Sequence, residues 1–249
     1  MLKKLELNEK QFFLLKNHCK KFNIEFLSTA FDEKSLNLLE KLELKRSKIP
    51  SGEITNLPFL QRIGSYNKEI ILSTGMSTLG EIEEAIDVIE NAGTPRSKII
   101  ALHCTSEYPA PVNEVNLKAM LTISNSLKIN VGYSDHTEGI SIAIAAVAMG
   151  AKIIEKHLTL DRSMEGPDHI ASIEPKDFKE MSSQIRKIES ALGDGLKKPT
   201  QSELKNMLVV RKSLVAAIDI KKGDLLTDKN IAIKRPGTGI SPMNIGEYI

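Results

Sequence analysis

Short apolar runs alternate with amphipathic segments along most of the chain. Each apolar run ends in hydroxyl, lysine, histidine or carboxylate side chains, and apolar residues at helical spacing follow it. The runs predict strands at residues 24–31, 47–52, 69–75, 98–106, 130–133 and 152–160. Helices are expected between the strands, ahead of them over residues 7–23, and after them up to Leu192. This repeat of strand and helix is typical of parallel βα units.

The repeat predicts an α/β fold in which about six strands form part of a (βα)8 TIM barrel. An open six-stranded sheet is the alternative. A closed barrel needs more strands ahead of residue 7, and the chain begins too late to supply them. Local signals support the helices, since Thr78 and Glu81 form a capping-box pattern and Gly93 marks the end of the same helix.

The C-terminal part of the chain has a different pattern. Residues 193–208 are polar and contain two glycines and a proline, so they predict a linker. Short β segments with a Lys-Gly turn follow, and they predict a small β-rich domain over residues 209–249. The barrel domain would then occupy residues 1–192. A β domain of roughly 40 residues seldom folds without another surface to pack on.

Composition narrows the classes of function. The chain has 249 residues with 34 basic and 32 acidic side chains, so its formal charge of +2 does not favour nucleic acid or an anionic membrane. Cys19 and Cys104 stand in unlike contexts, which favours reduced thiols. No signal peptide pattern and no apolar run of roughly 20 residues are present. We therefore expect a cytoplasmic enzyme with no nucleic acid or membrane partner.

Two histidines stand at the ends of neighbouring predicted strands. His136 follows one strand, and His157 lies one strand-to-strand repeat later. Equivalent strand ends in a barrel lie side by side on one rim, so both imidazoles could reach one small volume with Asp135, Glu155 and Asp168 nearby. Imidazole with carboxylate or substrate oxygen suits a divalent metal with open positions. For each histidine taken alone, a packed or hydrogen-bonded role is the alternative.

The polar strand ends form short motifs whose order and spacing are specific. They read Phe-Leu-Ser-Thr (26–29), Lys-Ile-Pro-Ser-Gly-Glu (48–53), Leu-Ser-Thr-Gly-Met (72–76), His-Cys-Thr-Ser-Glu-Tyr-Pro (103–109), Gly-Tyr-Ser-Asp-His-Thr (132–137), Glu-Lys-His-Leu-Thr-Leu-Asp (155–161), Gly-Pro-Asp-His (166–169) and Lys-Arg-Pro-Gly-Thr-Gly-Ile (234–240). On these motifs, nearly the whole chain resembles the sialic acid synthase family.

The resemblance implies a barrel followed by an antifreeze-like (SAF) domain, which in the family swaps across a homodimer to cap the partner's active site. It implies a transferase that condenses phosphoenolpyruvate with an N-acetylated aldose to give a nonulosonic (sialic or legionaminic) acid and phosphate. His136 and His157 match the family's metal ligands, with manganese as the first choice and magnesium or cobalt as alternatives. Glu155 and Asp168 resemble the carboxylates that manage the attacking water.

The resemblance also implies a substrate site built from several strand ends, because the phosphate and carboxylate of phosphoenolpyruvate need compact donors. The matching residues are Lys48, Ser51, Ser73, Ser106 and Ser134 for phosphoenolpyruvate, Tyr108 for the sugar, and Arg235 of the SAF domain for the N-acetyl group bound in the neighbouring subunit. Taken alone, each serine fits a helix N-cap and Arg235 fits a solvated surface charge.

The chain also departs from the family pattern. The first strands, which carry a glutamate, a lysine and a glutamine in the family, are missing, and the SAF domain stops early. We therefore expect a fragment that turns over little or not at all. The motifs resemble N-acetylneuraminate and N,N′-diacetyllegionaminate synthases more than pseudaminate synthases. The expected aldose is therefore N-acetylmannosamine or 2,4-diacetamido-2,4,6-trideoxymannose. A metal-dependent barrel hydrolase and a non-catalytic carbohydrate-binding or assembly protein of the same fold are the alternatives.

Overall fold

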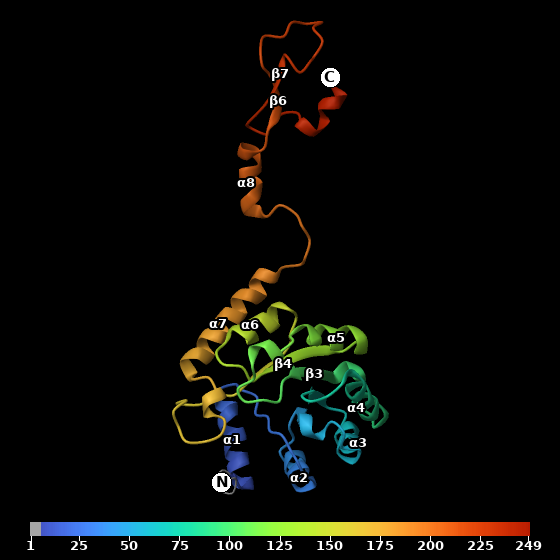
Figure 1. Cartoon of the computed structure of the whole chain (residues 1–249), viewed down its shortest axis with the longest axis vertical. Helices are drawn as coiled ribbons and strands as arrows, with labels where there is room; N and C mark the ends of the chain where they lie inside the picture. Colours follow the sequence, from blue (N-terminus) through green and yellow to red (C-terminus); the bar gives the residue numbers. More distant parts are fainter. Residues whose placement is uncertain (1–5) are drawn as a thin grey trace. The chain divides into compact units, whose positions relative to one another are not determined.

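The computed structural model describes residues 6–249 and divides them into two compact units. The first unit reaches Leu192, and the second spans Gly193–Ile249. Figure 1 follows the chain through both units by colour. The first unit is a layered α/β structure, and the second combines short helices with a small antiparallel sheet.

Within residues 6–192, five parallel strands form one sheet in the order in which they occur in the sequence. They are β1 (Arg46–Ile49), β2 (Glu69–Ser73), β3 (Ile99–Cys104), β4 (Asn130–Asp135) and β5 (Ile154–Lys156). Sequential strand order with a helix after each strand is the arrangement of a barrel. The sheet curls into a half-barrel (Figure 1), so the predicted barrel-type α/β fold is confirmed.

One ion pair demonstrates the curvature of the sheet. Lys48 lies on β1 and Glu155 on β5, the two outer strands of the described sheet, yet Lys48 Nζ and Glu155 Oε2 are 3.3 Å apart. Neighbouring strands are separated by about 4.8 Å, so the outer strands of a flat sheet of this size would lie roughly 19 Å apart. The sheet therefore bends strongly around its inner face, which brings the two side chains together.

Helices cover the outer face of the sheet. They are α2 (Glu33–Lys41), α3 (Leu57–Ser65), α4 (Leu79–Asn91), α5 (Lys118–Leu127), α6 (Ser141–Ala148) and α7 (Pro175–Leu192), with α1 (Glu9–Lys21) ahead of them. Thr78 and Glu81 form the predicted capping box at the start of α4. Figure 1 shows α7 beside α6, and these two helices are in contact. In the described part of the chain, no helix is both long and apolar enough to cross a bilayer.

The hydrophobic core lies between the sheet and these helices. Ile49, Leu72 and Ile99 on the outer face of the strands belong to one buried cluster with Ile86 and Ile89 of α4. Burying a side chain of this kind stabilises the fold by about 1.5–3 kcal/mol. The alternate strand positions face the interior of the half-barrel and carry polar side chains at the strand ends. One face of each strand is therefore used for packing and the other for chemistry.

Residues 24–31, predicted as a strand, form a single parallel bridge between Thr29 and Lys48. Among residues 6–249, β1 is the only strand with which this segment forms a backbone pair. Ile24 and Phe31 are 62% and 65% exposed. The segment pairs on one side only and is little buried, and its backbone pairing with β1 does not extend beyond this bridge. The prediction of a strand at residues 24–31 is therefore wrong in the described structure.

The second unit begins with α8 (Gln201–Val210), which precedes the antiparallel pair of the Gly193–Ile249 segment. This pair consists of β6 (Ser213–Ala216) and β7 (Ile231–Lys234). A 3₁₀ helix, η6 (Pro242–Glu247), follows them. The antiparallel pair is consistent with the small β-rich domain expected from the sequence.

Two segments of this unit differ from the prediction. Residues 201–208, expected to be part of a linker, are helical because Thr200 and Glu203 form a capping box that starts α8. The expected Lys-Gly turn is present at residues 222–223, but the residues on either side of it, 221 and 224–226, form no strand. The Lys221 amide donates to the Asp224 carboxylate at 2.8 Å, so this amide is satisfied within the turn and not by a neighbouring strand.

Candidate active site

The inner face of the half-barrel carries a polar side chain near the C-terminal end of each strand except β3, where Cys104 takes that place. The strand register sets Cys104 beside Ser134, and Ser134 beside Glu155. Lys48 on β1 and Ser73 at the end of β2 share this face and are buried. The C-terminal ends of the strands are the edge where barrels place their reactive groups.

Hydrogen bonds join these side chains into one network. The Lys48 ammonium donates to Ser73 Oγ at 2.8 Å and lies 3.3 Å from Glu155 Oε2. Ser134 Oγ donates to the other Glu155 oxygen at 2.7 Å. The side chain of Glu155 is nevertheless 39% exposed, so its carboxylate can also meet a ligand or water. A buried ammonium next to hydroxyl groups offers a binding position for an anion.

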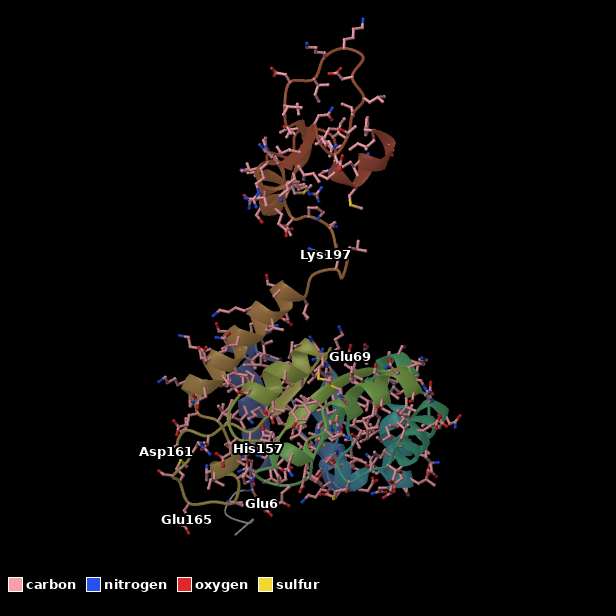
Figure 2. All side chains as sticks on the ribbon, turned by 45° about the horizontal axis from the view of Figure 1, so that its top comes forward. Glu6, Glu69, His157, Asp161, Glu165 and Lys197 are labelled. Carbon is pink, nitrogen blue, oxygen red and sulfur yellow. The ribbon has the colours of Figure 1, made fainter. Side chains whose placement is uncertain are left out.

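The rings of His136 and His157 lie close together beside this network. Their centroids are 5.6 Å apart, with the ring planes at 79°. His136 directly follows β4 and is buried, whereas His157 directly follows β5 and is partly exposed. Figure 2 shows His157 at the base of the loop that carries Asp161 and Glu165. Both imidazoles thus border one small volume.

One hydrogen bond, to the Thr105 carbonyl, sets the orientation of the His136 ring. Its Nδ1 lies 2.6 Å from the Thr105 carbonyl oxygen, and its Nε2 lies 3.2 Å from Ser134 Oγ. Because a carbonyl can only accept, Nδ1 carries the proton and Nε2 presents a lone pair. Ser134 donates its single proton to Glu155, which leaves that lone pair available. Burial lowers the pKa of His136 below its ordinary value, which favours the neutral ring.

This donor set is compatible with a divalent metal. A ligating histidine generally donates its other N–H to a carbonyl or carboxylate, as His136 does to Thr105. Imidazole with carboxylate suits manganese, iron, zinc or cobalt. Within residues 6–249, no group of three or more His, Cys, Asp or Glu side chains is spaced as a complete metal site. The residues therefore fit an ion held by two protein nitrogens, with its other positions open to water or substrate.

Tyr108 packs over both imidazoles from the loop after β3. Its ring centroid lies 4.1 Å from that of His136 and 5.3 Å from that of His157. Burial raises the pKa of Tyr108, so its phenol stays protonated and can donate a hydrogen bond. The residue is partly exposed and is therefore accessible to a molecule bound beside the histidines.

Ser51, Gly75, Cys104 and Ser106 pack closely where β2 and β3 end, and we call them the Gly75 cluster. The Gly75 amide donates to Ser51 Oγ at 3.0 Å, and Cys104 Sγ lies 3.6 Å from the same hydroxyl oxygen. A Cβ at Gly75 would lie 2.2 Å from Ser106 Oγ and 2.9 Å from Ser51 Oγ, distances that are too short for a side chain. Glycine at this position therefore allows the two serines to approach the same small space.

Asp135, expected as an acidic neighbour of the histidines, faces away from them. Its carboxylate accepts the amide and hydroxyl of Thr137 and pairs with Lys156. Side chains alternate along a strand, so Asp135 points to the opposite face from Ser134 and His136. The expectation that this carboxylate lies beside the imidazoles is therefore wrong.

Two other predicted residues form none of the hydrogen bonds described for the buried network. Asp168 is exposed at the rim, with Oδ2 3.7 Å from His157 Nδ1. Arg235 directly follows β7 in the second unit and forms a cis peptide bond with Pro236. The other predicted residues of the first unit lie in the network, over the histidines or in the Gly75 cluster.

Sequence reasoning missed three groups of this site. Gly75 closes the same Ser-Thr-Gly motif as Ser73, and a glycine directly after a polar strand end was a usable signal. Cys104 follows the strand alternation and could have been placed on the inner face. The Thr105 carbonyl left no signal, because every residue type supplies a backbone carbonyl.

A separate hollow of about 720 Å³ lies between α4 and α5. Outward-facing residues such as His103 line much of it, together with Met76 and Lys118. It includes Cys104 and Ser106 of the Gly75 cluster but neither of the paired histidines. The chemistry of the inner face, and not this hollow, identifies the candidate active site.

Comparison with known proteins agrees with this arrangement. The model of the NeuB family matches residues 1–197, and that of the SAF domain matches residues 211–249. The chain is 57% identical over 249 residues to the N,N′-diacetyllegionaminic acid synthase of Campylobacter jejuni, covering 100% of this chain and 75% of that protein. It is 45% identical over 251 residues to the protein of the same name from Legionella pneumophila, covering 100% and 70%.

A solved structure supports the same relationship. The N-acetylneuraminic acid (sialic acid) synthetase of Leptospira borgpetersenii aligns with a TM-score of 0.76 and 38% identity, over 81% of this chain and 70% of that chain. The family match covers every strand and helix that builds the inner-face network. The chain therefore belongs to the NeuB family, the sialic acid synthase family that its motifs resemble, and carries a SAF domain at its C-terminal end.

Proposed function

We propose that this chain acts as a nonulosonic acid synthase, a transferase that joins phosphoenolpyruvate to an N-acetylated aldose and releases phosphate. The observation that carries the proposal is the network that runs from Ser73 through Lys48 and Glu155 to Ser134, whose hydroxyl oxygen lies 3.2 Å from His136 Nε2. It sets donors for an anion directly beside imidazoles and a carboxylate that suit carbonyl and proton chemistry. The two relatives named as N,N′-diacetyllegionaminic acid synthases support the same activity.

Phosphoenolpyruvate would bind on the Lys48 side of the network. Its phosphate and carboxylate would receive hydrogen bonds from the ammonium of Lys48 and from the hydroxyls of Ser51, Ser73 and Ser106, and from Ser134 when its proton turns from Glu155 to the ligand. A hydrogen bond to a charged group contributes about 1.5–3 kcal/mol. Lys48 and Ser73 are buried and bonded to each other, so they lose little freedom when the anion binds.

His136 and His157 would hold a divalent ion, with manganese as the first choice and magnesium or cobalt as alternatives. When bound, the ion supplies Lewis acidity toward the aldehyde of the open-chain sugar. The Thr105 carbonyl presets the His136 ring so that Nε2 is the ligating atom. Tyr108, whose ring packs at a tilt against both imidazoles, would close one side of the sugar position.

The carboxylates would handle the protons of the reaction. The methylene carbon of phosphoenolpyruvate would use its C=C π electrons to form a bond with the aldehyde carbon, while the C=O π bond opens and the aldehyde oxygen takes a proton. A water would then add to the electron-deficient carbon that carries the phosphate oxygen. Glu155 would take the proton of that water, with Asp168 as the second carboxylate. Cleavage of the carbon–oxygen bond then releases phosphate, and the positive charge of Lys48 stabilises the departing anion.

Among the possible aldoses we favour 2,4-diacetamido-2,4,6-trideoxymannose, which gives N,N′-diacetyllegionaminic acid. The support is the similarity to two relatives with that product in their names. The proposal also includes a cytoplasmic homodimer in which Arg235 of one subunit reaches the N-acetyl group bound in the other. The match of the SAF domain supports this arrangement.

Product analysis tests the proposed function. The purified chain is incubated with Mn²⁺, phosphoenolpyruvate and either the diacetamido sugar or N-acetylmannosamine, and phosphate and nonulosonic acid are quantified. We expect slow turnover with equal amounts of both products, and a faster rate with the diacetamido sugar. Phosphate release without a nonulosonic acid would identify a hydrolase, and binding of phosphoenolpyruvate without turnover would identify a non-catalytic protein. Either result would overturn the proposal.

A further inference from the structure

A buried charged residue directly precedes each of the paired histidines. Asp135 precedes His136, and Lys156 precedes His157. The two charged residues are register partners on β4 and β5, and Lys156 Nζ lies 2.9 Å from Asp135 Oδ2. Their side chains are 1% (Lys156) and 0% (Asp135) exposed, so the ion pair lies in the packed layer outside the half-barrel.

The ion pair also holds Thr137, the residue that follows His136. Asp135 Oδ1 accepts the Thr137 amide at 3.0 Å and the Thr137 hydroxyl at 2.7 Å. The Lys156 ammonium donates to the Thr137 carbonyl. The residues on both sides of His136 are therefore tied to the strand that carries His157.

Strand β5 (Ile154–Lys156) needs such an anchor because it is short. It forms an edge of the described five-stranded sheet, and beyond it the described residues add only the isolated bridge between Leu158 and Ile173. A short edge strand has few ladder hydrogen bonds. Without another connection to β4, His157 could shift relative to His136.

Stability alone does not account for this ion pair. Removing two charges from water costs about as much as their attraction returns, so apolar side chains of the same size could fill the layer equally well. The ion pair instead contributes geometric specificity. The Lys156 ammonium bonds to both the Asp135 carboxylate and the Thr137 carbonyl, and this fixes the register and spacing of β4 and β5.

We propose that Asp135 and Lys156 form a positioning clamp that sets the rings of His136 and His157 at the separation and orientation a shared metal ion requires. The inference rests on the proposed function, since it takes the two histidines as the metal ligands. Both charged side chains face away from the inner surface, so they act through the histidines and do not touch substrate.

The clamp is tested with the double substitution Asp135→Asn and Lys156→Met in the full chain. Asparagine keeps an oxygen for Thr137, and methionine keeps the apolar length of the lysine, so no unpaired charge remains buried. Arg96→Met is the matched control. It removes ion pairs with Glu90 and Asp87, which belong to α4 and lie away from the histidines.

Two readouts separate positioning from folding. ¹⁵N NMR of the metal-free protein at about pH 8, where histidine rings are neutral, reports the tautomer of His136, which is the Nδ1–H form in the wild type. We expect a mixture of tautomers in the double variant. We also expect its dissociation constant for Mn²⁺, measured by electron paramagnetic resonance, to rise about ten- to a hundredfold. Arg96→Met should match the wild type in both measurements.

A double variant that keeps the wild-type tautomer and Mn²⁺ affinity would overturn the proposal. Should that variant not fold, Thr137→Val, which removes one hydrogen bond of the clamp, is measured in the same way and should shift both readouts in the same direction. An unchanged result for Thr137→Val would then overturn it. A wild type that fails to bind Mn²⁺ while the tautomer still responds would refute the proposed metal role and support the positioning role of the clamp.

Discussion

Lys48 is the single residue on which the proposed anion site depends most, because its buried ammonium contacts both Ser73 and Glu155. Lys48→Met keeps the apolar stem and removes the charge. We expect the dissociation constant for phosphoenolpyruvate to rise about ten- to a hundredfold, since a hydrogen bond to a charged group contributes about 1.5–3 kcal/mol. Isothermal titration calorimetry measures this change.

Lys98→Met is the control for this substitution. Lys98 donates to the side chain and carbonyl of Asn67 just before β3 begins, at the opposite end of the strand from the site. Its removal should leave the affinity for phosphoenolpyruvate unchanged. If Lys48→Met and the wild type bind phosphoenolpyruvate equally, the anion site has been assigned to the wrong residues.

His136 should make the stability of the metal-free protein depend on pH. Burial is the main cause that holds the pKa of His136 below its ordinary 6.5, and His157 adds to the effect, while the Thr105 carbonyl and the carboxylates of Glu155 and Asp135 oppose it. The unfolded chain therefore binds this proton at a higher pH than the folded chain. The stabilising contribution of the neutral ring is complete above pH 6.5 and is lost as the pH falls through 6.5 toward the folded-state pKa.

Urea unfolding of the chelator-treated protein at about pH 8 and about pH 5.5 checks this dependence. In His136→Asn, whose amide can still donate to the Thr105 carbonyl, the free energy of unfolding should fall less between the two conditions than in the wild type. An equal decrease in the two proteins would assign the pH dependence to other groups.

At the scale of elements, the start of α4 depends on reciprocal hydrogen bonds between Thr78 and Glu81. Thr78→Ala removes the hydroxyl that accepts the Glu81 amide and should lower the free energy of unfolding by about 1 kcal/mol. Urea denaturation gives the difference. Thr122→Ala, on the exposed side of α5, is the control and should cause no loss, because alanine is a better helix former. A similar loss in both variants would mean that the cap is not the cause.

At the scale of the whole molecule, the proposed exchange of SAF domains can be tested by mixing two variants. His136→Asn alters the first unit and Arg235→Ala the second, and each variant alone should have low activity. If the SAF domain of one subunit completes the site of the other, half of the sites in each mixed dimer contain both wild-type residues. Random mixing should then restore about a quarter of all sites. A mixture no more active than its components would contradict the exchange.

The sequence by itself determined the local structure of this protein and the kind of chemistry at its strand ends. The apolar periodicity predicted the strands from β1 to β5 and the helices between them, and the Thr78 capping box was predicted and found. The motifs also identified the family. Such features depend on neighbours within a few residues, because backbone conformation and side-chain alternation are short-range properties.

Only the tertiary structure decided which distant side chains meet. Lys48 and Glu155 lie on the two outer strands and touch because the sheet curls, and Asp135 turns to Lys156 because the register sets both on the outer face. Residues 24–31 have the composition of a strand yet form one bridge, since a strand needs partners as well as propensity. Curvature and register arise from interactions summed over the whole sheet, and no short stretch of sequence contains them.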